Sequence, residues 1–366
     1  MKRVCCIFNY APDYRESIYK KIDETFDTQF VFAEEVEHGK DGGIPKIDYS
    51  IFSKKPYRTS NRHLISNYIW RTNILKLPFK KFSDFIITGD ANLSYFPFFI
   101  FCRLLGKRTY GWGHGFKTLN GISGMLGRLY MKLINGYFVY SEKGKSRMES
   151  FGIPGKKLHV IYNSLSGRIS EIKTYPKDIY TQLFKNNNPV LIFIGRLTAS
   201  KRIDVLLDIL KKHKDEGLLY NLMIIGDGPE KIKLEQQCQE LNIQDSVYFY
   251  GACHDNAILA PFLYNADLCV SPGNVGLTAI SALAYGTPVI SHDSFDHQGP
   301  EFETIIPNQT GLLYRYNDFD DLSKKIRQWL ENPHDRDTIR KACLEVINSK
   351  WNSDYQIGII KQTIEA

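Results

Sequence analysis

Two cationic side chains follow the first buried strand expected in the second half of the chain. The strand is expected over 189–194, and Arg196 and Lys201 come shortly after it. In open α/β sheets, the carboxyl ends of parallel strands line the crevice where ligands bind. An arginine can grip two oxygens of a diphosphate and a lysine supplies a point charge, so the pair could also stabilise a departing diphosphate. Two surface cations at the start of a helix are the alternative interpretation.

A second stretch, residues 271–291, joins a turn, a short helix and a buried strand in SPGNVGLTAISALAYGTPVIS. The helix is expected over 277–285 and should end at Gly286. A glycine-bearing loop before a helix leaves backbone N–H groups unpaired at the positive end of the helix dipole, which suits a phosphate. Gly276 permits close approach of the backbone to a ligand. An ordinary strand–loop–helix–strand unit is the alternative.

Residues 271–291 resemble the donor-binding segment of the retaining glycosyltransferases of family four, which have the two-domain GT-B fold. Gly276-Leu277 and 284–290 match the family pattern, but Gly273 and Ser281 stand where it has two glutamates. In the family the first glutamate touches the donor sugar and the second holds the nucleotide ribose. The resemblance therefore implies replacements: Asn274 or Ser271 for the sugar contact, and Ser281 through a water for the ribose.

The resemblance also implies roles for residues outside this stretch. It assigns the diphosphate contacts to Arg196 and Lys201, and a donor-sugar contact to His114, which lies among glycines in Gly-Trp-Gly-His-Gly. A loop histidine bonded to a neighbour is the alternative for His114. Arg15 and Asp90 are the polar candidates on the acceptor side. The expected nucleotide-sugar-binding residues are Gly195, Gly226, Asp227, Ala252, Cys253, Asn274, Val275, Gly276, Leu277, Thr278 and Ser281.

Two of these assignments have structural alternatives. The Gly-Asp-Gly-Pro turn at 226–229 resembles the turn that the family places beside the nucleotide, but it could be a purely structural turn. The segment 297–301 resembles the family's Gly-Gly-x-Pro-Glu turn. There Glu301 could be a helix N-terminal acid without a catalytic duty.

The length of 366 residues allows two domains, each with its own core. Strands and helices alternate, which predicts an α/β protein of two Rossmann-like, doubly wound domains facing across a cleft. An acceptor-side domain is expected over 1–170, together with a C-terminal helix at 352–366 that crosses back to it. A nucleotide-sugar-binding domain is expected over 171–351. The polar segment 34–61 fits this alternation worst and is expected to be an irregular insertion or hairpin.

The charge is unevenly distributed along the chain. Residues 1–160 hold 26 Lys and Arg against 14 Asp and Glu, a balance of +12, and the remainder holds 21 against 26, a balance of −5. A basic first half suggests contact with an anionic membrane, with 96–101, Arg103, Lys107 and Arg108 as the docking segment. A core helix with a basic end, or a solvated basic face without a partner, is the alternative. No nucleic-acid partner is expected.

The remaining composition favours a cytoplasmic protein, at most at the inner face of the cell membrane. The seven cysteines are scattered without disulfide or metal-site spacing, no signal peptide is evident, and no apolar run is long enough to span a bilayer.

The expected activity is retaining transfer of a sugar from a nucleotide diphosphate sugar to a glycan or lipid-linked oligosaccharide in surface polysaccharide biosynthesis. Neither a cofactor nor an obligatory metal is expected. A non-catalytic subunit that binds a nucleotide sugar or glycan is one alternative. A phosphorylase or epimerase built on the same fold is the other.

Overall fold

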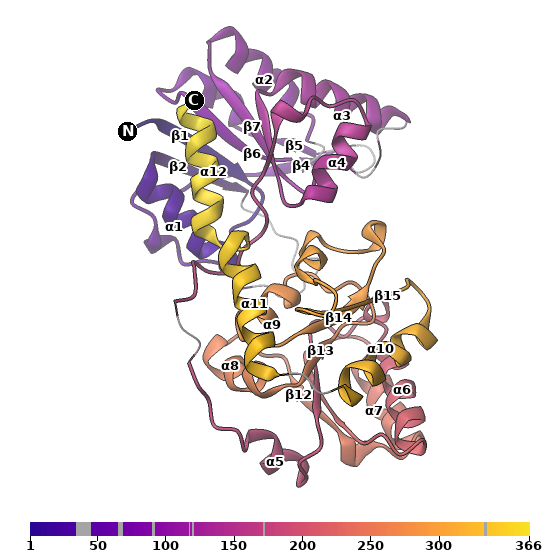
Figure 1. The fold of residues 1–366 in the computed structure, drawn as a ribbon. Helices are drawn as coiled ribbons and strands as arrows, with labels where there is room; N and C mark the ends of the chain where they lie inside the picture. Colours follow the sequence, from indigo (N-terminus) through magenta and orange to yellow (C-terminus); the bar gives the residue numbers. More distant parts are fainter. Residues whose placement is uncertain are drawn as a thin grey trace. The chain divides into compact units, whose positions relative to one another are not determined.

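The structure, a computed structural model, describes residues 1–33, 45–64, 69–89, 92–116, 118, 121–170, 173–332 and 335–366. The chain forms two compact units (Figure 1). The first comprises Met1–Gly167 and Lys350–Ala366, and the second comprises Arg168–Ser349. These bounds lie close to those expected from the sequence. The acceptor-side candidate Asp90 lies outside the described residues.

The first unit is built on a seven-stranded parallel sheet with the order β3-β2-β1-β6-β7-β8-β9. Its central strands are nearly continuous apolar runs because helices cover both faces of a parallel sheet. β4 (Asn61–His63) and β5 (Ile69–Arg71) form a separate antiparallel pair. The sheet strands are β1 Arg3–Phe8, β2 Asp27–Ala33, β3 Tyr57–Thr59, β6 Asp84–Thr88, β7 Arg108–Gly113, β8 Gly136–Val139 and β9 Leu158–Val160.

Five α-helices in the described part of the chain belong to the first unit, together with short 3-10 turns. The Ser141 hydroxyl caps α4 by accepting from the amide of Gly144. The C-terminal helix packs against α1 (Figure 1), and its Ile360 and Ile364 are fully buried, so the expected return of the chain end to the first unit is confirmed. The helices are α1 Glu16–Thr25, α2 Tyr95–Leu104, α3 Gly121–Leu133, α4 Glu142–Ser150 and α12 Ser353–Glu365.

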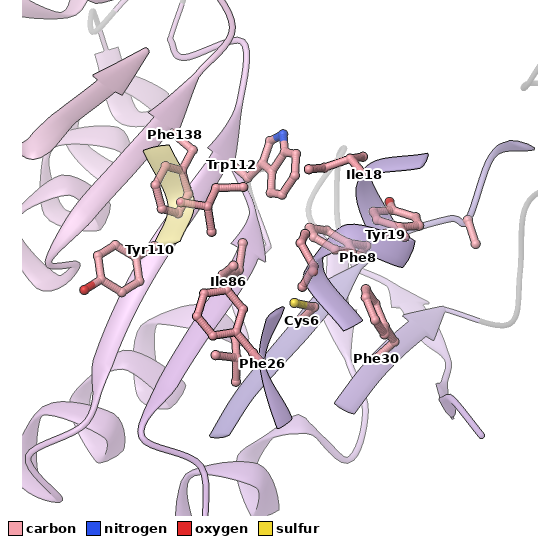
Figure 2. Packing of buried hydrophobic residues seen from close by; sticks show 14 of the residues in the cluster. Cys6, Phe8, Ile18, Tyr19, Phe26, Phe30, Ile86, Tyr110, Trp112 and Phe138 are labelled. Atoms are coloured by element: carbon pink, nitrogen blue, oxygen red, sulfur yellow. The ribbon is translucent and has the colours of Figure 1, made fainter. Parts of the chain in front are cut away.

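Aromatic side chains from neighbouring strands fill the core on one face of this sheet (Figure 2). Phe8 of β1 stacks on Tyr19 with ring centroids 5.3 Å apart and meets Trp112 of β7 edge-on at 5.5 Å. Such ring pairs add to the free energy gained by burial. They fix the carboxyl ends of β1 and β7, from which the candidate site residues of this unit project.

The second unit has a six-stranded parallel sheet with the order β12-β11-β10-β13-β14-β15. In chain order this is 3-2-1-4-5-6, so the topological switch point, where such sheets bind ligands, lies between β10 and β13. The strands are β10 Val190–Ile194, β11 Asn221–Ile225, β12 Val247–Gly251, β13 Leu268–Val270, β14 Val289–His292 and β15 Gly311–Tyr314. The helices are α5 Ile179–Phe184, α6 Ile203–Asp215, α7 Lys231–Glu240, α8 Asn256–Asn265, α9 Thr278–Ala284, α10 Phe319–Glu331 and α11 Arg336–Lys350.

Three short elements depart from the sequence expectation. Within 34–61, expected to be an irregular insertion or hairpin, residues 57–59 supply the edge strand β3, and 34–44 lie outside the described residues. The polar composition of 165–188 predicts a linker, but this stretch contains α5, and the sequence pattern predicted no strand at β15. All three are only three to six residues long, which is too short for a clear apolar periodicity.

Candidate functional site

Two loops of the second unit are hydrogen-bonded to each other at the switch point. The ammonium of Lys201 donates to the main-chain oxygen of Asn274 at 2.6 Å and to its side-chain oxygen at 2.8 Å. In the other direction, the amide of Gly273 donates to the carbonyl of Lys201 at 3.0 Å. The structure therefore brings Lys201 to the loop that precedes α9. This proximity is needed if both are to bind one diphosphate, as the sequence analysis expects.

Gly273 lies where no larger residue fits. A Cβ placed on it would lie 2.1 Å from the carbonyl oxygen of Ser200 and 2.8 Å from the Cα of Lys201. A glutamate at this position would require the whole Lys201 loop to move. Close packing of the two loops thus restricts this position to glycine.

Two backbone amides in the turn before α9 make no hydrogen bond in the described part of the protein. The amides of Gly276 and Leu277 donate to no group in the described part of the protein, and a Cβ on Gly276 would meet nothing within 4 Å. Gly276 has φ +56°, a conformation that favours glycine. The expected row of unpaired amides is shorter than the sequence suggested, because the amide of Val275 already donates to Gln298 Oε1 at 2.9 Å.

Buried hydrogen bonds hold this turn from beneath. The Ser291 hydroxyl donates to the carbonyls of Ser271 and Gly273, at 2.9 and 3.1 Å. Gln298 Nε2 donates to Ser291 Oγ at 2.7 Å. Ser271 is buried and its hydroxyl donates to the carbonyl of Asn274 at 3.4 Å, so Ser271 is poorly placed to contact a sugar, whereas Asn274 is exposed.

Sequence reasoning missed Gln298 and Ser291. Gln298 stands at a glycine position of the family's Gly-Gly-x-Pro-Glu turn, and that departure was the one signal that could have singled it out. Ser291 offered no signal, because its role depends on which carbonyls pack above β14.

One further hydrogen bond positions the first turn of α9. The Thr278 hydroxyl donates to the carbonyl of Ile194 at 3.0 Å and so ties α9 to the end of β10. This contact is structural, and it differs from the ligand contact expected for Thr278. Ser281 lies half-buried one turn along the same helix. Because α9 has only seven residues, its dipole contributes less than the fixed cations nearby.

A carboxylate lies near Lys201. Glu301 is only 3% exposed, and its Oε2 lies 2.4 Å from the position that a Cβ on Gly299 would take. Burial lowers the pKa of Lys201 to about 8, and the negative charge of Glu301 opposes that shift. Glu301 therefore helps to keep the ammonium protonated, a role that the sequence did not indicate.

The remaining candidates of this unit lie on the same edge of the sheet. A Cβ on Gly226 would lie 1.9 Å from the carbonyl oxygen of Gly195, so the turns after β10 and β11 touch each other. Asp227 is exposed and accepts from the amide of Gly228 at 2.6 Å, as a turn residue does.

The other candidates of this unit differ in exposure. After β12, Ala252 is exposed and Cys253 is half-buried. Arg196 is exposed, and its side chain makes no hydrogen bond or ion pair within the described ranges.

In the first unit, two of the predicted residues gather around one tyrosine. The ring of His114, an exposed residue just after β7, meets Tyr140 edge-on at 5.0 Å. Arg15 donates to the Tyr140 hydroxyl at 2.5 Å. Tyr140, which directly follows β8, thus contacts both His114 from the end of β7 and Arg15 from the 3-10 turn after β1, and the roles of His114 and Arg15 stay predictions. Over the described residues, no cluster of three or more His, Cys, Asp and Glu side chains is placed to hold a metal ion.

Residues 176–345 match the family of glycosyl transferases group 1. This match lies entirely within the second unit, and it includes the whole of the Lys201 and Gly276 loops. It supports the family resemblance drawn from Gly276-Leu277 and 284–290.

Curated relatives and solved structures agree with this match. The chain is 35% identical, over 28% of its length and 26% of the relative's, to a GDP-mannose-dependent alpha-(1-6)-phosphatidylinositol dimannoside mannosyltransferase of Mycobacterium tuberculosis. It is 27% identical, over 52% of its length and 50% of the relative's, to the lipopolysaccharide 1,6-galactosyltransferase of Escherichia coli. The chain thus spans half or less of the length of these relatives.

The fold is similar to that of a solved structure. Anabaena Alr3699/HepE, solved in complex with UDP, matches this chain with a TM-score of 0.75 at 16% identity, over all of both chains. The fold is GT-B.

Lys201 should make the stability of the protein depend on pH. Its pKa is lower in the folded protein, about 8, than the ordinary 10.5, so between these values the unfolded chain binds more protons. The contribution of Lys201 to stability is present above pH 10.5 and is lost as the pH falls through 8. We expect Lys201→Met to gain stability relative to wild type below pH 8, and the gain to shrink towards pH 10.

Calorimetric melting temperatures of both proteins from pH 7 to pH 10 measure this difference. Lys212→Met, which removes an exposed lysine from α6, is the control and should show no such trend. A pH-independent difference for Lys201→Met would contradict the burial of its charge.

Proposed function

We propose that the protein is a retaining glycosyltransferase. It would move a sugar from a nucleotide diphosphate sugar to a glycan or lipid-linked oligosaccharide during surface polysaccharide biosynthesis. The observation that carries this proposal is the Lys201 ammonium, held by Asn274 beside the open backbone at Gly276. The group 1 match and the named mannosyl- and galactosyltransferase relatives support it.

In the proposed donor complex, the diphosphate lies against the second unit's cations. Lys201 and Arg196 bind its oxygens, and the amides of Gly276 and Leu277 donate to it. When the bond between the sugar and the diphosphate breaks, the leaving group gains negative charge, and these fixed donors stabilise that charge. The leaving group then helps to take the acceptor proton on the face from which the acceptor attacks, which retains the configuration. No metal is required in this scheme.

The contacts to the donor's sugar, ribose and base are proposed for other residues. Asn274 is the exposed polar group nearest to Lys201 and is proposed to contact the sugar. Ser281 is proposed to reach the ribose through a water, and the backbone of Ala252 and Cys253 the nucleobase. His114 is proposed to contact the donor sugar from the first unit.

A non-catalytic nucleotide-sugar-binding subunit is the second candidate. The packing at Gly273 favours it, because the chain cannot place a carboxylate there without moving the Lys201 loop. Detection of sugar transfer decides between the two candidates.

Loss of the Lys201 charge should weaken donor binding and transfer together. In wild type, one of UDP, GDP, dTDP and CMP should raise the melting temperature, and the matching nucleotide sugar should support transfer. Lys201→Met should weaken nucleoside diphosphate binding about 10- to 100-fold, because it loses a charge-assisted hydrogen bond. Arg196→Met should act in the same direction, and Lys212→Met should bind normally. Nucleotide binding without transfer to any acceptor would favour the binding subunit.

The expected docking segment is only partly exposed, so membrane contact would need further residues beside it. Phe98 and Phe99 are buried in the core, and Arg108 pairs with the buried Asp84 at 2.7 Å, so much of the expected docking segment is not available. No helix within the described ranges is both long and apolar enough to cross a membrane. The 3-10 turn η3 (Ile74–Phe79), α2 and α3 instead expose large apolar side chains, namely Phe79, Ile100, Leu104, Leu105, Met125 and Leu129.

We propose that these six side chains form a docking surface for an anionic bilayer. α2 packs against both η3 and α3, and Arg103 donates to the carbonyl of Lys132 at 3.3 Å, so the three elements are neighbours. They also carry the basic residues Lys76, Arg103, Arg128 and Lys132. Apolar side chains with basic neighbours are the composition that binds anionic lipid surfaces.

Two acidic substitutions on this surface should abolish membrane binding. Wild type should co-sediment with vesicles that contain phosphatidylglycerol and should stay in the supernatant with phosphatidylcholine alone. Leu104→Glu combined with Met125→Glu should stay in the supernatant with both. Ile232→Glu, which changes an exposed apolar residue of α7, is the control and should behave like wild type. Equal sedimentation of the double variant and wild type would refute this surface.

A further inference from the structure

The first unit contains a buried arginine that sequence reasoning did not single out. Arg71, the last residue of β5, is only 1% exposed. Its Nε donates to Asn61 Oδ1 at 3.1 Å, and its Nη2 donates to Asn9 Oδ1. Its guanidinium carbon lies 5.7 Å from the ring centroid of Tyr95. Neutral groups hold the guanidinium in place without neutralising its charge.

The charge of Arg71 has no counterpart among the described residues. No carboxylate there forms an ion pair with it, and its buried Nη1 has no hydrogen-bond partner. Buried cations are strongly disfavoured unless an anion pairs with them. A functional anion that pairs with Arg71 would explain why the residue is kept in this position.

A second unpartnered donor belongs to the same cluster. Asn92 is 2% exposed, and its Oδ1 accepts from the amide and the hydroxyl of Ser94, at 3.1 and 2.6 Å. The same hydroxyl accepts from the amide of Arg71 at 3.2 Å, so Ser94 links the two residues. The Nδ2 of Asn92 has no partner within the described part of the chain. Both unsatisfied groups are N–H donors and one of them is charged, so an oxyanion, which only accepts hydrogen bonds and carries a negative charge, would satisfy both.

The cluster lies at the ligand-binding edge of its sheet. Asn9 directly follows β1, and Asn92 comes four residues after the end of β6, the neighbouring strand. His114 follows β7, the next strand in the sheet. The carboxyl ends of parallel strands thus bring the Arg71 cluster to the same edge as the residues expected on the acceptor side.

We propose that Arg71 and Asn92 bind one oxyanion, a phosphate or a carboxylate, of the acceptor substrate. Assignment of this anion to the acceptor rests on the proposed function, whereas anion binding itself does not. Both donor atoms are buried, so neighbouring side chains must shift to admit the anion. The bound anion is then shielded from water, which strengthens each hydrogen bond. The +12 balance of residues 1–160 favours the approach of such an acceptor.

Titration with small anions tests the site directly. The full-length protein is titrated with methyl phosphate or glucuronate at constant ionic strength, kept with chloride, and binding is followed by calorimetry and melting temperature. Saturable binding of methyl phosphate indicates a phosphate-bearing acceptor, and binding of glucuronate indicates an acidic glycan. Binding of either supports the site, and binding of neither overturns it.

Two variants locate the binding. Arg71→Met should weaken anion binding about 10- to 100-fold, because a charge-assisted hydrogen bond is lost, while Lys76→Met, an equal charge change at an exposed site, should not. Asn92→Asp keeps the oxygen that Ser94 requires and places a carboxylate beside the guanidinium. It should raise the melting temperature without added anion and abolish the response to anion. Asn73→Asp, an exposed site, is its control.

The donor site must be separated from this one, since it also attracts phosphate. Lys201→Met should keep the Arg71-dependent binding, and Arg71→Met should keep nucleotide binding. Anion binding that survives unchanged in Arg71→Met and Asn92→Asp would overturn the proposal. If Arg71→Met does not fold, Asn92→Asp alone decides. Anion binding in a protein that binds no nucleotide would reject the proposed function and leave the anion site standing.

Discussion

The hydrogen bonds between the Lys201 loop and the loop before α9 are the constraint on which the candidate site of the second unit depends. The ammonium of Lys201 is held by both oxygens of Asn274, and the Gly273 amide returns a bond to the Lys201 carbonyl. This packing leaves no room for a Cβ at Gly273. The two loops are therefore in close contact at Gly273, with the Lys201 ammonium at their junction.

The close contact between these two loops affects the charge of Lys201. Burial makes the charged form of Lys201 less favourable, and Glu301 partly offsets this from another turn. A cation that is held in place but poorly solvated attracts a diphosphate strongly, because the ligand supplies the counter-charge that water does not. Arg71 in the first unit is likewise a buried cation without a paired anion, since the neutral side-chain amides of Asn61 and Asn9 hold it. Both units thus place an under-compensated cation at the carboxyl edge of a parallel sheet.

Much of this arrangement could be predicted from the sequence, and the reasons for the remainder are physical. Long apolar strands such as Val190–Ile194 and the Gly276–Leu277 turn carry local signals, so the α/β fold and the pairing of Lys201 with the α9 loop were foreseeable. The hydrogen bond that Gln298 accepts from the Val275 amide and the burial of Arg71 depend on side chains that meet only after folding. Within the expected docking segment 96–101, the register of α2 turns Phe98 and Phe99 to the core and leaves Ile100 exposed, and that register is set by packing.

The position of a bound nucleoside diphosphate tests the role of the Lys201 junction most directly. A crystal structure of the complex should place a phosphate oxygen about 2.7–2.9 Å from the Lys201 ammonium, as charge-assisted hydrogen bonds require, and another within hydrogen-bond distance of the Gly276 amide. A diphosphate bound elsewhere, with Lys201 still bonded only to Asn274, would contradict the proposal that this junction is the donor site.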